Sequence, residues 1–334
     1  MSEAVPVVPR PVREAPGEGV FALSNAVRVA VADDPALVGA GTVWADALSR
    51  QGGGDVGLVV GTDRGDGVVQ LVLDEALPAD GAYRLVVAPR RVTVTAGSTD
   101  GLAPALATVR QRLRRGPGGV AELPVGEVED APHHGWRGLE VRGPWSALGL
   151  RSLCLLVDVL ALYKLDVLGL PLRGPEGWRL RLRGTDAPAG ALGPGEWTSL
   201  VAYADVRGVA VVPGLVVPAG PEGPRRPADA LGAVLAELVP MSPAAFVHLR
   251  AAGTGADPAG GAAARVAEAA TAVVSAGRLP LVAPQPVGTG LPEGTLLLLD
   301  TLTAGQDARA AAVAAAREGT GVVLGRGPAP AAGG

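Results

Sequence analysis

The chain has 334 residues, of which 48% are hydrophobic, and a formal net charge of −4. Its length allows two domains, because a domain typically takes about 150 residues. The negative charge excludes the broad basic surface that nucleic-acid-binding proteins carry, so no nucleic acid is expected as a partner. With five Trp, three Tyr and two Phe, any stacking platform for sugar rings must be small.

The first 18 residues form a Pro-rich lead-in without the basic and then apolar segments of a signal peptide. No apolar run in the rest of the chain is read as long enough to cross a membrane. The single cysteine excludes an intrachain disulfide and a cysteine-rich metal site. We therefore expect a soluble, cytoplasmic protein with no membrane partner.

Residues 19–116 are predicted to form a small α+β domain. Apolar alternation and helical spacing predict strands at 20–31, 56–61, 68–73, 82–87 and 91–95 and helices at 35–50 and 101–114. The arginines at the end of the second helix suit the negative end of its dipole. Residues 117–133 are rich in Gly and Pro and are predicted to be a linker.

From residue 134 to residue 327, apolar strands alternate with amphipathic helices. The predicted strands are 138–142, 167–172, 209–217, 246–250, 280–283, 296–301 and 321–324, and the helices are 153–164, 196–207, 228–238, 262–276 and 308–318. Such alternation predicts a parallel sheet, arranged as a doubly wound sheet or a β/α barrel. A closed barrel needs eight strands, so these seven predict an incomplete barrel, followed by a disordered tail at 328–334.

An incomplete barrel has two open edges. Unpaired strand edges invite pairing with another chain. We therefore expect a homo-oligomer or a protein partner that covers the open edge of the barrel. A terminal segment could fill the gap instead, but the Pro- and Gly-rich tail is poorly suited to forming a strand.

Several short segments occur in the same order as in a known family. They are Y-R-L at 83–85, E-D-A-P-H-H-G-W-R-G at 129–138, A-L-Y-K-L-D-V-L at 161–168, E-G-W-R at 176–179 and V-A-Y-A-D-V-R-G-V-A-V-V-P at 201–213. In this ordered combination the chain resembles glycoside hydrolase family 20, the retaining β-N-acetylhexosaminidases, over nearly its whole length. The resemblance implies a small α+β domain followed by a catalytic β/α barrel.

The resemblance also implies a mechanism in which the substrate's own acetamido oxygen attacks the anomeric carbon. The family needs an Asp to orient the acetamide and a Glu as general acid/base, in a motif H-[IVL]-G-G-D-E after the fourth strand. The matching segment here is H-L-R-A-A-G at 248–253, with Ala252 in place of the Asp and Gly253 in place of the Glu. Neither residue can carry charge or transfer a proton, so hydrolysis is not expected.

The family's polar motifs are missing from the other strand ends as well. The third-strand motif P-E-[IV]-D-M-P-G-H reads P-G-L-V-V-P-A-G at 213–220, and the fifth-strand motif G-W-D-E reads A-P-Q-P at 283–286. The ends of the first and second strands have changed in the same way. Catalysis in β/α barrels takes place at these carboxyl ends of the strands. We therefore predict that the framework is kept while the catalytic site is lost.

Three residues match positions of the family's sugar site. Arg137 matches an Arg that binds sugar hydroxyls, and an Arg that bridges the two domains is an equal alternative. Trp178 matches a Trp that lies beneath the sugar, although core packing is favoured for it. His248 matches the His of the fourth strand, and a hydrogen-bonded core residue is favoured over a catalytic base.

A new polar cluster near the strand ends is a further candidate ligand site. Its members would be Glu140, Arg142, Arg173, Arg250, Gln285 and Asp300. Several arginines at one mouth would suit an anionic ligand, although ion pairs between strands are the favoured interpretation. No cofactor or metal is expected, because His133 and His134 lack a third ligand at zinc-binding spacing.

These observations leave three functions. A degenerate family member that acts as a ligand-binding or scaffold pseudoenzyme is favoured, with an amino sugar or an anionic small molecule as its ligand. The second function is that of a repurposed enzyme of small-molecule biosynthesis, which uses the new polar cluster. A genuine β-N-acetylhexosaminidase is the third, and Ala252 and Gly253 argue against it.

Overall fold

The computed structural model describes the chain with short gaps. The described residues are 6–24, 26–52, 54–141, 143–174, 177–217, 227–251, 261–283, 290–300, 306–317 and 321–325. The chain divides into two compact units, and each is described by itself. Unit 1 comprises Met1–Arg137, Leu155–Asp166 and Tyr203–Val209, and unit 2 comprises Gly138–Cys154, Val167–Ala202 and Ala210–Gly334.

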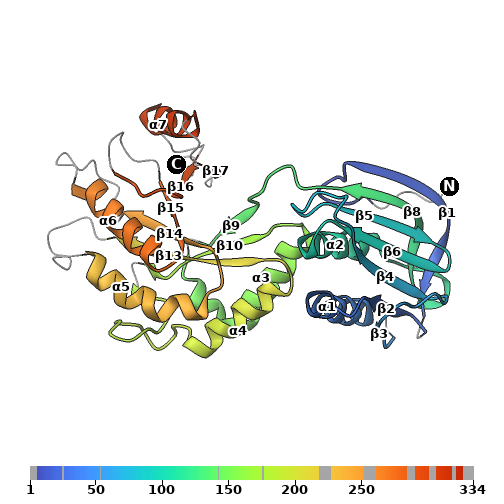
Figure 1. The fold of residues 1–334 in the computed structure, drawn as a ribbon. Coiled ribbons are helices and arrows are strands. Elements are labelled where there is room, and N and C mark those ends of the chain that lie inside the picture. The colour runs from blue at the N-terminus through green and yellow to red at the C-terminus, as the bar shows by residue number, and fades with distance from the viewer. Residues whose placement is uncertain are drawn as a thin grey trace, which may run out of the picture. The chain divides into compact units, whose positions relative to one another are not determined.

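Unit 1 contains a mixed eight-stranded sheet in the order β1-β8-β5-β6-β4-β2-β3, with the short β7 paired to β8 (Figure 1). The strands are β1 (Arg13–Leu23), β2 (Arg28–Val31), β3 (Gly57–Val60), β4 (Val68–Leu73), β5 (Tyr83–Ala88), β6 (Arg91–Ala96), β7 (Arg114–Arg115) and β8 (Ala121–Asp130). β5 and β6, which confirm the strands predicted at 82–87 and 91–95, form an antiparallel hairpin, whereas β4 pairs in parallel with both β2 and β6.

Two helices cover the sheet of unit 1, α1 (Pro35–Gly52) and α2 (Leu102–Arg112). Asp34 begins α1, because its carboxylate accepts hydrogen bonds from the backbone N–H groups of Ala36 and Leu37 at 2.9 and 3.0 Å. The short 3₁₀ helix η1 (Thr99–Gly101) leads into α2. Trp44 of α1 and Leu102 of α2 are buried in one core with the apolar side chains of the strands. Both predicted helices are therefore confirmed.

Two segments that the sequence predicts to lack regular structure are strands. β1 begins inside the predicted lead-in of residues 1–18, and β8 lies inside the predicted linker of residues 117–133. β8 is an internal strand, because it pairs with β1 on one side and β5 on the other. The linker prediction is wrong because the glycines and prolines belong to an irregular strand pair, whose register shifts between Pro16 and Val20. The prediction of a single strand at 20–31 is also wrong, because β1 ends and β2 begins within that range.

Unit 2 contains a seven-stranded parallel sheet in the order β17-β16-β15-β14-β13-β10-β9 (Figure 1). The strands are β9 (Gly138–Glu140), β10 (Val167–Pro171), β13 (Ala210–Val217), β14 (Phe246–Ala251), β15 (Leu279–Val282), β16 (Leu296–Asp300) and β17 (Val322–Gly325). All seven predicted barrel strands are confirmed, with small shifts of their bounds. The sheet is curled, as expected for an incomplete β/α barrel.

The predicted barrel helices are confirmed as well. They are α3 (Gly149–Leu162), α4 (Pro194–Asp205), α5 (Pro227–Leu238), α6 (Gly261–Ser275) and α7 (Gln306–Arg317). The division between the two units runs through α3 and α4, whose C-terminal residues belong to unit 1. A two-stranded sheet of β11 (Arg173–Gly174) and β12 (Gly177–Trp178) follows β10 and was not predicted.

The strands β9 and β17 form the two edges of the parallel sheet within the described ranges. Each edge strand exposes an apolar side chain, Leu139 in β9 and Leu324 in β17. Exposed apolar side chains on strand edges favour pairing with another strand. The expectation that a second copy or a protein partner covers these edges stays a prediction.

One segment contradicts the expectation that no apolar run reaches membrane length. Trp145–Leu162, which covers the 3₁₀ helix η3 (Trp145–Leu148) and α3, is long and apolar enough to cross a membrane by length and composition alone. Leu153 and Val157 supply part of this hydrophobicity from the core, while Leu155 and Val159 are exposed. Core helices of soluble proteins can have the same length and composition, so the segment is only weak evidence for a membrane span.

Candidate ligand-binding site

Glu140, His248 and Arg250 form a polar cluster in unit 2. The Nδ1 atom of His248 lies 2.9 Å from Oε2 of Glu140, and Nη1 of Arg250 lies 3.3 Å from Oε1. Glu140 ends β9 whereas the other two lie in β14, and β10 and β13 separate these strands in the sheet. In a flat sheet, three spacings of about 4.8 Å would keep them apart. The contacts therefore require a curled sheet with the three side chains on its concave face.

Glycines on the two intervening strands leave room for this cluster. Gly169 of β10 is the strand partner of Glu140, and a Cβ atom there would lie 3.3 Å from Cβ of Glu140. Gly214 of β13 is the strand partner of His248. Strand partners point to the same face of a sheet, so both glycines lie on the face of the cluster. Their missing side chains allow Glu140 to reach His248 across the sheet.

The three side chains differ in their access to solvent. The His248 side chain is 10% exposed, that of Glu140 18% and that of Arg250 36%. The Glu140 carboxylate accepts from the Arg250 guanidinium, so their opposite charges offset each other. The cluster therefore offers hydrogen-bond donors and acceptors rather than a strong net charge, which suits hydroxyl and amide groups better than an anion.

The other predicted site residues lie elsewhere or outside the described residues. Arg173 of β11 lies over the ring of Trp178 in β12, with its guanidinium carbon 5.9 Å from the ring centre. The half-buried Trp178 is therefore a partner of an arginine and not only a core residue. The residues outside the described ranges are Arg142, Ala252, Gly253 and Gln285, and the side chain of Asp300 is not described either.

Two tryptophans that the sequence did not single out support this part of unit 2. Trp145 and Trp197 are both buried, with their ring centres 6.3 Å apart. The Trp145 indole donates to the carbonyl of Pro171 at 2.8 Å, and the Trp197 indole donates to the Ser242 hydroxyl at 2.9 Å. The end of β10 is thus held by a buried hydrogen bond. Buried rings whose indole N–H groups are hydrogen-bonded in this way are typical of tryptophans in a protein core.

Arg137 belongs to unit 1 and is heavily engaged there. Its Nη2 atom lies 2.7 Å from Oδ2 of Asp166, and its Nε donates to the carbonyl of Lys164 at 2.9 Å. Nη1 donates to the carbonyl of His134. Burial raises the pKa of Asp166, and the contacts with Arg137 partly oppose that rise. This geometry suits the structural role, and the alternative that Arg137 binds sugar hydroxyls stays a prediction.

Comparisons with known proteins agree with these features. Residues 4–131 match the family model described as glycosyl hydrolase family 20, domain 2. A β-N-acetylhexosaminidase from Cellulomonas fimi is 36% identical over 229 residues, which make up 64% of this chain and 46% of that protein. These matches support the resemblance of the chain to glycoside hydrolase family 20. A β-hexosaminidase from Akkermansia muciniphila is 31% identical over 169 residues, 45% of this chain and 34% of the relative. The chain thus spans less than half the length of these two relatives.

A solved family 20 structure shares the fold of nearly the whole chain. The β-N-acetylhexosaminidase from Streptomyces coelicolor A3(2) is similar with a TM-score of 0.83 and 24% sequence identity. The similarity covers 97% of this chain and 76% of that one. At this identity the similarity shows the fold, and the site has to be argued from the residues.

β14 is the strand on which the resemblance to family 20 expects the motif with the catalytic pair. Counted from β9, β14 is the fourth strand of the parallel sheet, and it contains His248 as the resemblance implies. The strand ends at Ala251, directly before Ala252 and Gly253 in the sequence. The family's Asp and Glu positions therefore follow the strand that the motif predicts.

A buried ionic cluster in unit 1 was missed by the sequence analysis. The Nζ atom of Lys164 lies 2.7 Å from Oδ2 of Asp130 and 3.0 Å from the hydroxyl of Tyr83. The Tyr83 hydroxyl also lies 2.5 Å from Oγ1 of Thr108. Burial lowers the pKa of Lys164 and raises that of Tyr83. Lys164 has a φ of 60°, which is unfavourable for a residue with a Cβ atom. The fold therefore places the Lys164 ammonium group in this cluster despite an unfavourable backbone conformation.

We expect the contribution of Tyr83 to stability to fall at high pH. Burial raises the pKa of Tyr83 above its ordinary value near 10. The unfolded chain therefore loses this proton at a lower pH than the folded chain, and stability present below pH 10 is lost as pH rises further. The destabilisation caused by Tyr83→Phe should be about 1.4 kcal/mol smaller at pH 11 than at pH 9, measured by denaturant unfolding. Tyr163→Phe, at an exposed position, is the control. A Tyr83→Phe effect that does not change with pH would contradict the expectation.

Unit 1 also contains two cavities. One, of about 310 Å³, is lined mainly by charged side chains, those of Asp80, Asp100, Arg137, Lys164, Asp166 and Arg207, and by smaller residues around them. The other, of about 330 Å³, lies along α1 and α2. Neither cavity is lined by Glu140, His248 or Arg250. Within the described ranges, no group of three or more His, Cys, Asp or Glu residues could hold a metal ion.

Proposed function

We propose that this chain is a family 20 member that binds a sugar without hydrolysing it. The observation that carries the proposal is the pair Ala252-Gly253, which occupies the positions of the family's orienting Asp and acid/base Glu. Without the Glu no group at that position protonates the leaving oxygen, and without the Asp nothing there stabilises the charge on the acetamide. The framework that positions the pair is nevertheless kept in β14.

The Glu140–His248–Arg250 cluster supports binding of a neutral amino sugar. The Arg250 guanidinium offers N–H donors at 36% exposure, and Glu140 offers carboxylate oxygens. Paired donors and acceptors of this kind match sugar hydroxyls and an acetamide group. An anionic small molecule is disfavoured at this cluster, because Glu140 already balances the charge of Arg250.

Calorimetric titration with N-acetylglucosamine tests the binding. We expect saturable heat with the unaltered chain, and Arg250→Met should weaken binding at least about 10-fold, since hydrogen bonds to charged groups contribute about 1.5–3 kcal/mol. Arg183→Met, an exposed arginine of the same unit, should leave the affinity unchanged. No saturable heat, or equal effects of the two variants, would contradict the proposal.

The same titration separates the two interpretations of Arg137. If Arg137 holds sugar hydroxyls, Arg137→Ala removes binding while the unfolding midpoint changes little. If its task is the ion pair with Asp166, Arg137→Ala lowers the midpoint and leaves the affinity unchanged. The bonds of Arg137 within unit 1 favour the second result.

A second candidate is an enzyme repurposed for another reaction, which the contact between His248 and Glu140 favours. A carboxylate on Nδ1 orients an imidazole and leaves Nε2 for proton transfer. Proton NMR of N-acetylglucosamine incubated with the chain distinguishes the candidates. An unchanged spectrum supports a binding protein, and new resonances that disappear in His248→Phe support an enzyme.

A further inference from the structure

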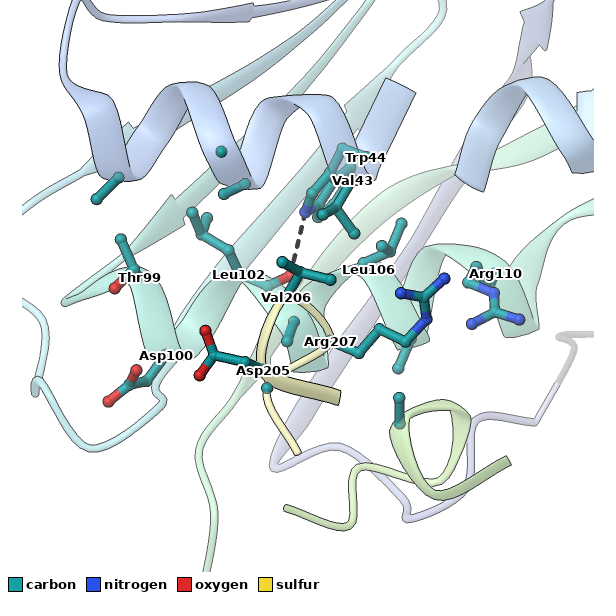
Figure 2. A pocket seen from close by; sticks show the side chains of 17 residues that line it. Val43, Trp44, Thr99, Asp100, Leu102, Leu106, Arg110, Asp205, Val206 and Arg207 are labelled. Carbon is teal, nitrogen blue, oxygen red and sulfur yellow. Dashed lines mark hydrogen bonds between the residues drawn. The ribbon is translucent and has the colours of Figure 1, made fainter. Parts of the chain in front are cut away.

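The groove along α1 and α2 in unit 1 has the features of a second binding site (Figure 2). It encloses about 330 Å³, enough for a small organic molecule. Its lining comes from α1, from η1 and α2, from Ala161 and from the turn of residues 205–208, all of which belong to unit 1. None of these residues belongs to the Glu140–His248–Arg250 cluster, so the groove is independent of the proposed sugar site.

The middle of the groove is apolar and open. Val43, Leu106 and Val206 line it, and Val206 is half exposed although it is a large apolar side chain. Gly39 of α1 also lines it, and a Cβ atom there would meet nothing within 4 Å. A glycine inside a helix is less favourable than an alanine, because it loses more backbone freedom on folding. Gly39 therefore keeps space open at the expense of helix stability.

Arg110 lies at one end of the groove with no partner for part of its guanidinium. Its Nε atom is buried without a hydrogen bond, although the residue as a whole is only partly buried. Asp158 attracts the guanidinium electrostatically, but its carboxylate forms its ion pair with Arg207. The neighbouring arginines are already paired, Arg207 with Asp158 at 2.8 Å and Arg50 with Asp46 at 2.5 Å. A buried N–H group without an acceptor is unfavourable, and an anion that bound here would supply the acceptor. The structure thus has one surplus positive charge at this end.

The opposite end of the groove carries negative charge. Figure 2 shows Thr99, Asp100 and Asp205 at that end and Arg110 with Arg207 at the other. Carboxylates repel an anionic group and attract hydrogen-bond donors. A bound molecule would therefore lie in one orientation, with its anionic group towards Arg110.

We propose that this groove binds a small organic acid with an apolar, ring-sized body. Its carboxylate or sulfonate pairs with Arg110, and its body covers Val43, Leu106 and Val206. Binding gives the buried Nε–H group of Arg110 an acceptor, so the anion contributes more affinity than it would at a fully exposed arginine.

Two fluorescent probes of the same shape test the proposal. The first is 1-anilinonaphthalene-8-sulfonate, and the second is N-phenyl-1-naphthylamine, which has the same rings and no charge. We expect Arg110→Met to weaken the sulfonate at least about 10-fold and to change the affinity of the uncharged probe less than twofold. Gly39→Leu, which fills the groove, should weaken both probes. Arg90→Met, an exposed arginine paired with Asp66, should change neither.

Thermal unfolding gives a second readout. Arg110→Met removes a buried N–H group that has no hydrogen-bond acceptor, so the variant should remain folded and its Tm should not fall below that of the unaltered chain. The proposal is overturned if the sulfonate does not bind, if Gly39→Leu leaves its affinity unchanged, or if Arg110→Met weakens both probes equally. It is also overturned if Arg110→Met lowers Tm, because Arg110 would then serve packing.

Discussion

Asp130→Ala is expected to lower the free energy of unfolding by about 3–5 kcal/mol, because it leaves a buried ammonium group without its counter-charge. The side chain of Lys164 is 6% exposed and that of Asp130 11% exposed, and their charged atoms lie 2.7 Å apart. Burial already lowers the pKa of Lys164, and Asp130 opposes that shift. Chemical denaturation at pH 7 measures the loss.

A second substitution tests the cause of this loss. Lys164→Met in the Asp130→Ala background removes the stranded charge, and most of the lost stability should return, since an apolar pair is often as stable as a buried ion pair. Glu129→Ala is the matched control in the same strand, where the carboxylate pairs with exposed arginines. Its effect should be at most about 1 kcal/mol. An Asp130→Ala effect as small as that of the control would contradict the account.

Trp197→Ala is expected to lower the stability of unit 2 by about 3–5 kcal/mol, the usual effect of removing a large buried aromatic side chain. Trp197 is 0% exposed and contacts Trp145. The substitution also leaves the buried Ser242 hydroxyl without its indole donor. Trp197→Phe keeps much of the ring volume and should lose less. Circular dichroism during denaturation measures both changes without relying on tryptophan fluorescence.

Trp178→Ala is the comparison for this prediction. Trp178 is half-buried, and the Arg173 guanidinium lies over its ring. Removing the Trp178 side chain therefore leaves a smaller cavity than removing that of Trp197. We expect its effect to be clearly below that of Trp197→Ala. The two units have separate cores, so each midpoint has to be read from its own transition if unfolding occurs in two steps. Equal effects at both positions would contradict the view that the Trp145–Trp197 pair anchors unit 2.

The sequence predicts the strands and helices of unit 2 well, because their hydrophobic runs are long and regular. It fails at β8, where apolar residues alternate but Pro124 and Gly126 interrupt the pattern. The structure shows why the glycine is there. A Cβ atom on Gly126 would lie 2.5 Å from the carbonyl oxygen of Ala15 in β1, and its φ is 147°. A glycine, which is typical of linkers, thus allows β1 and β8 to approach each other closely.

The candidate sites were harder to predict from the sequence than the fold. Glu140 and His248 are far apart in sequence and meet only because the sheet curls and Gly169 and Gly214 leave space between them. The helix dipole accounts for the arginines at the end of α2, yet it does not reveal that Nε of Arg110 is buried without a hydrogen bond. Such contacts depend on tertiary packing, which periodicity does not encode.

The most direct test of the central claim is hydrolysis of a chromogenic N-acetylglucosaminide from pH 4 to pH 8, beside an intact family 20 enzyme at equal concentration. The account predicts a rate lower by at least about 10²–10⁴-fold at every pH, because the general acid/base is missing at Gly253. Turnover comparable to that of the intact enzyme would contradict it. Such turnover would mean that another carboxylate acts as the general acid/base. If Glu140→Gln abolished the turnover, that carboxylate would be Glu140.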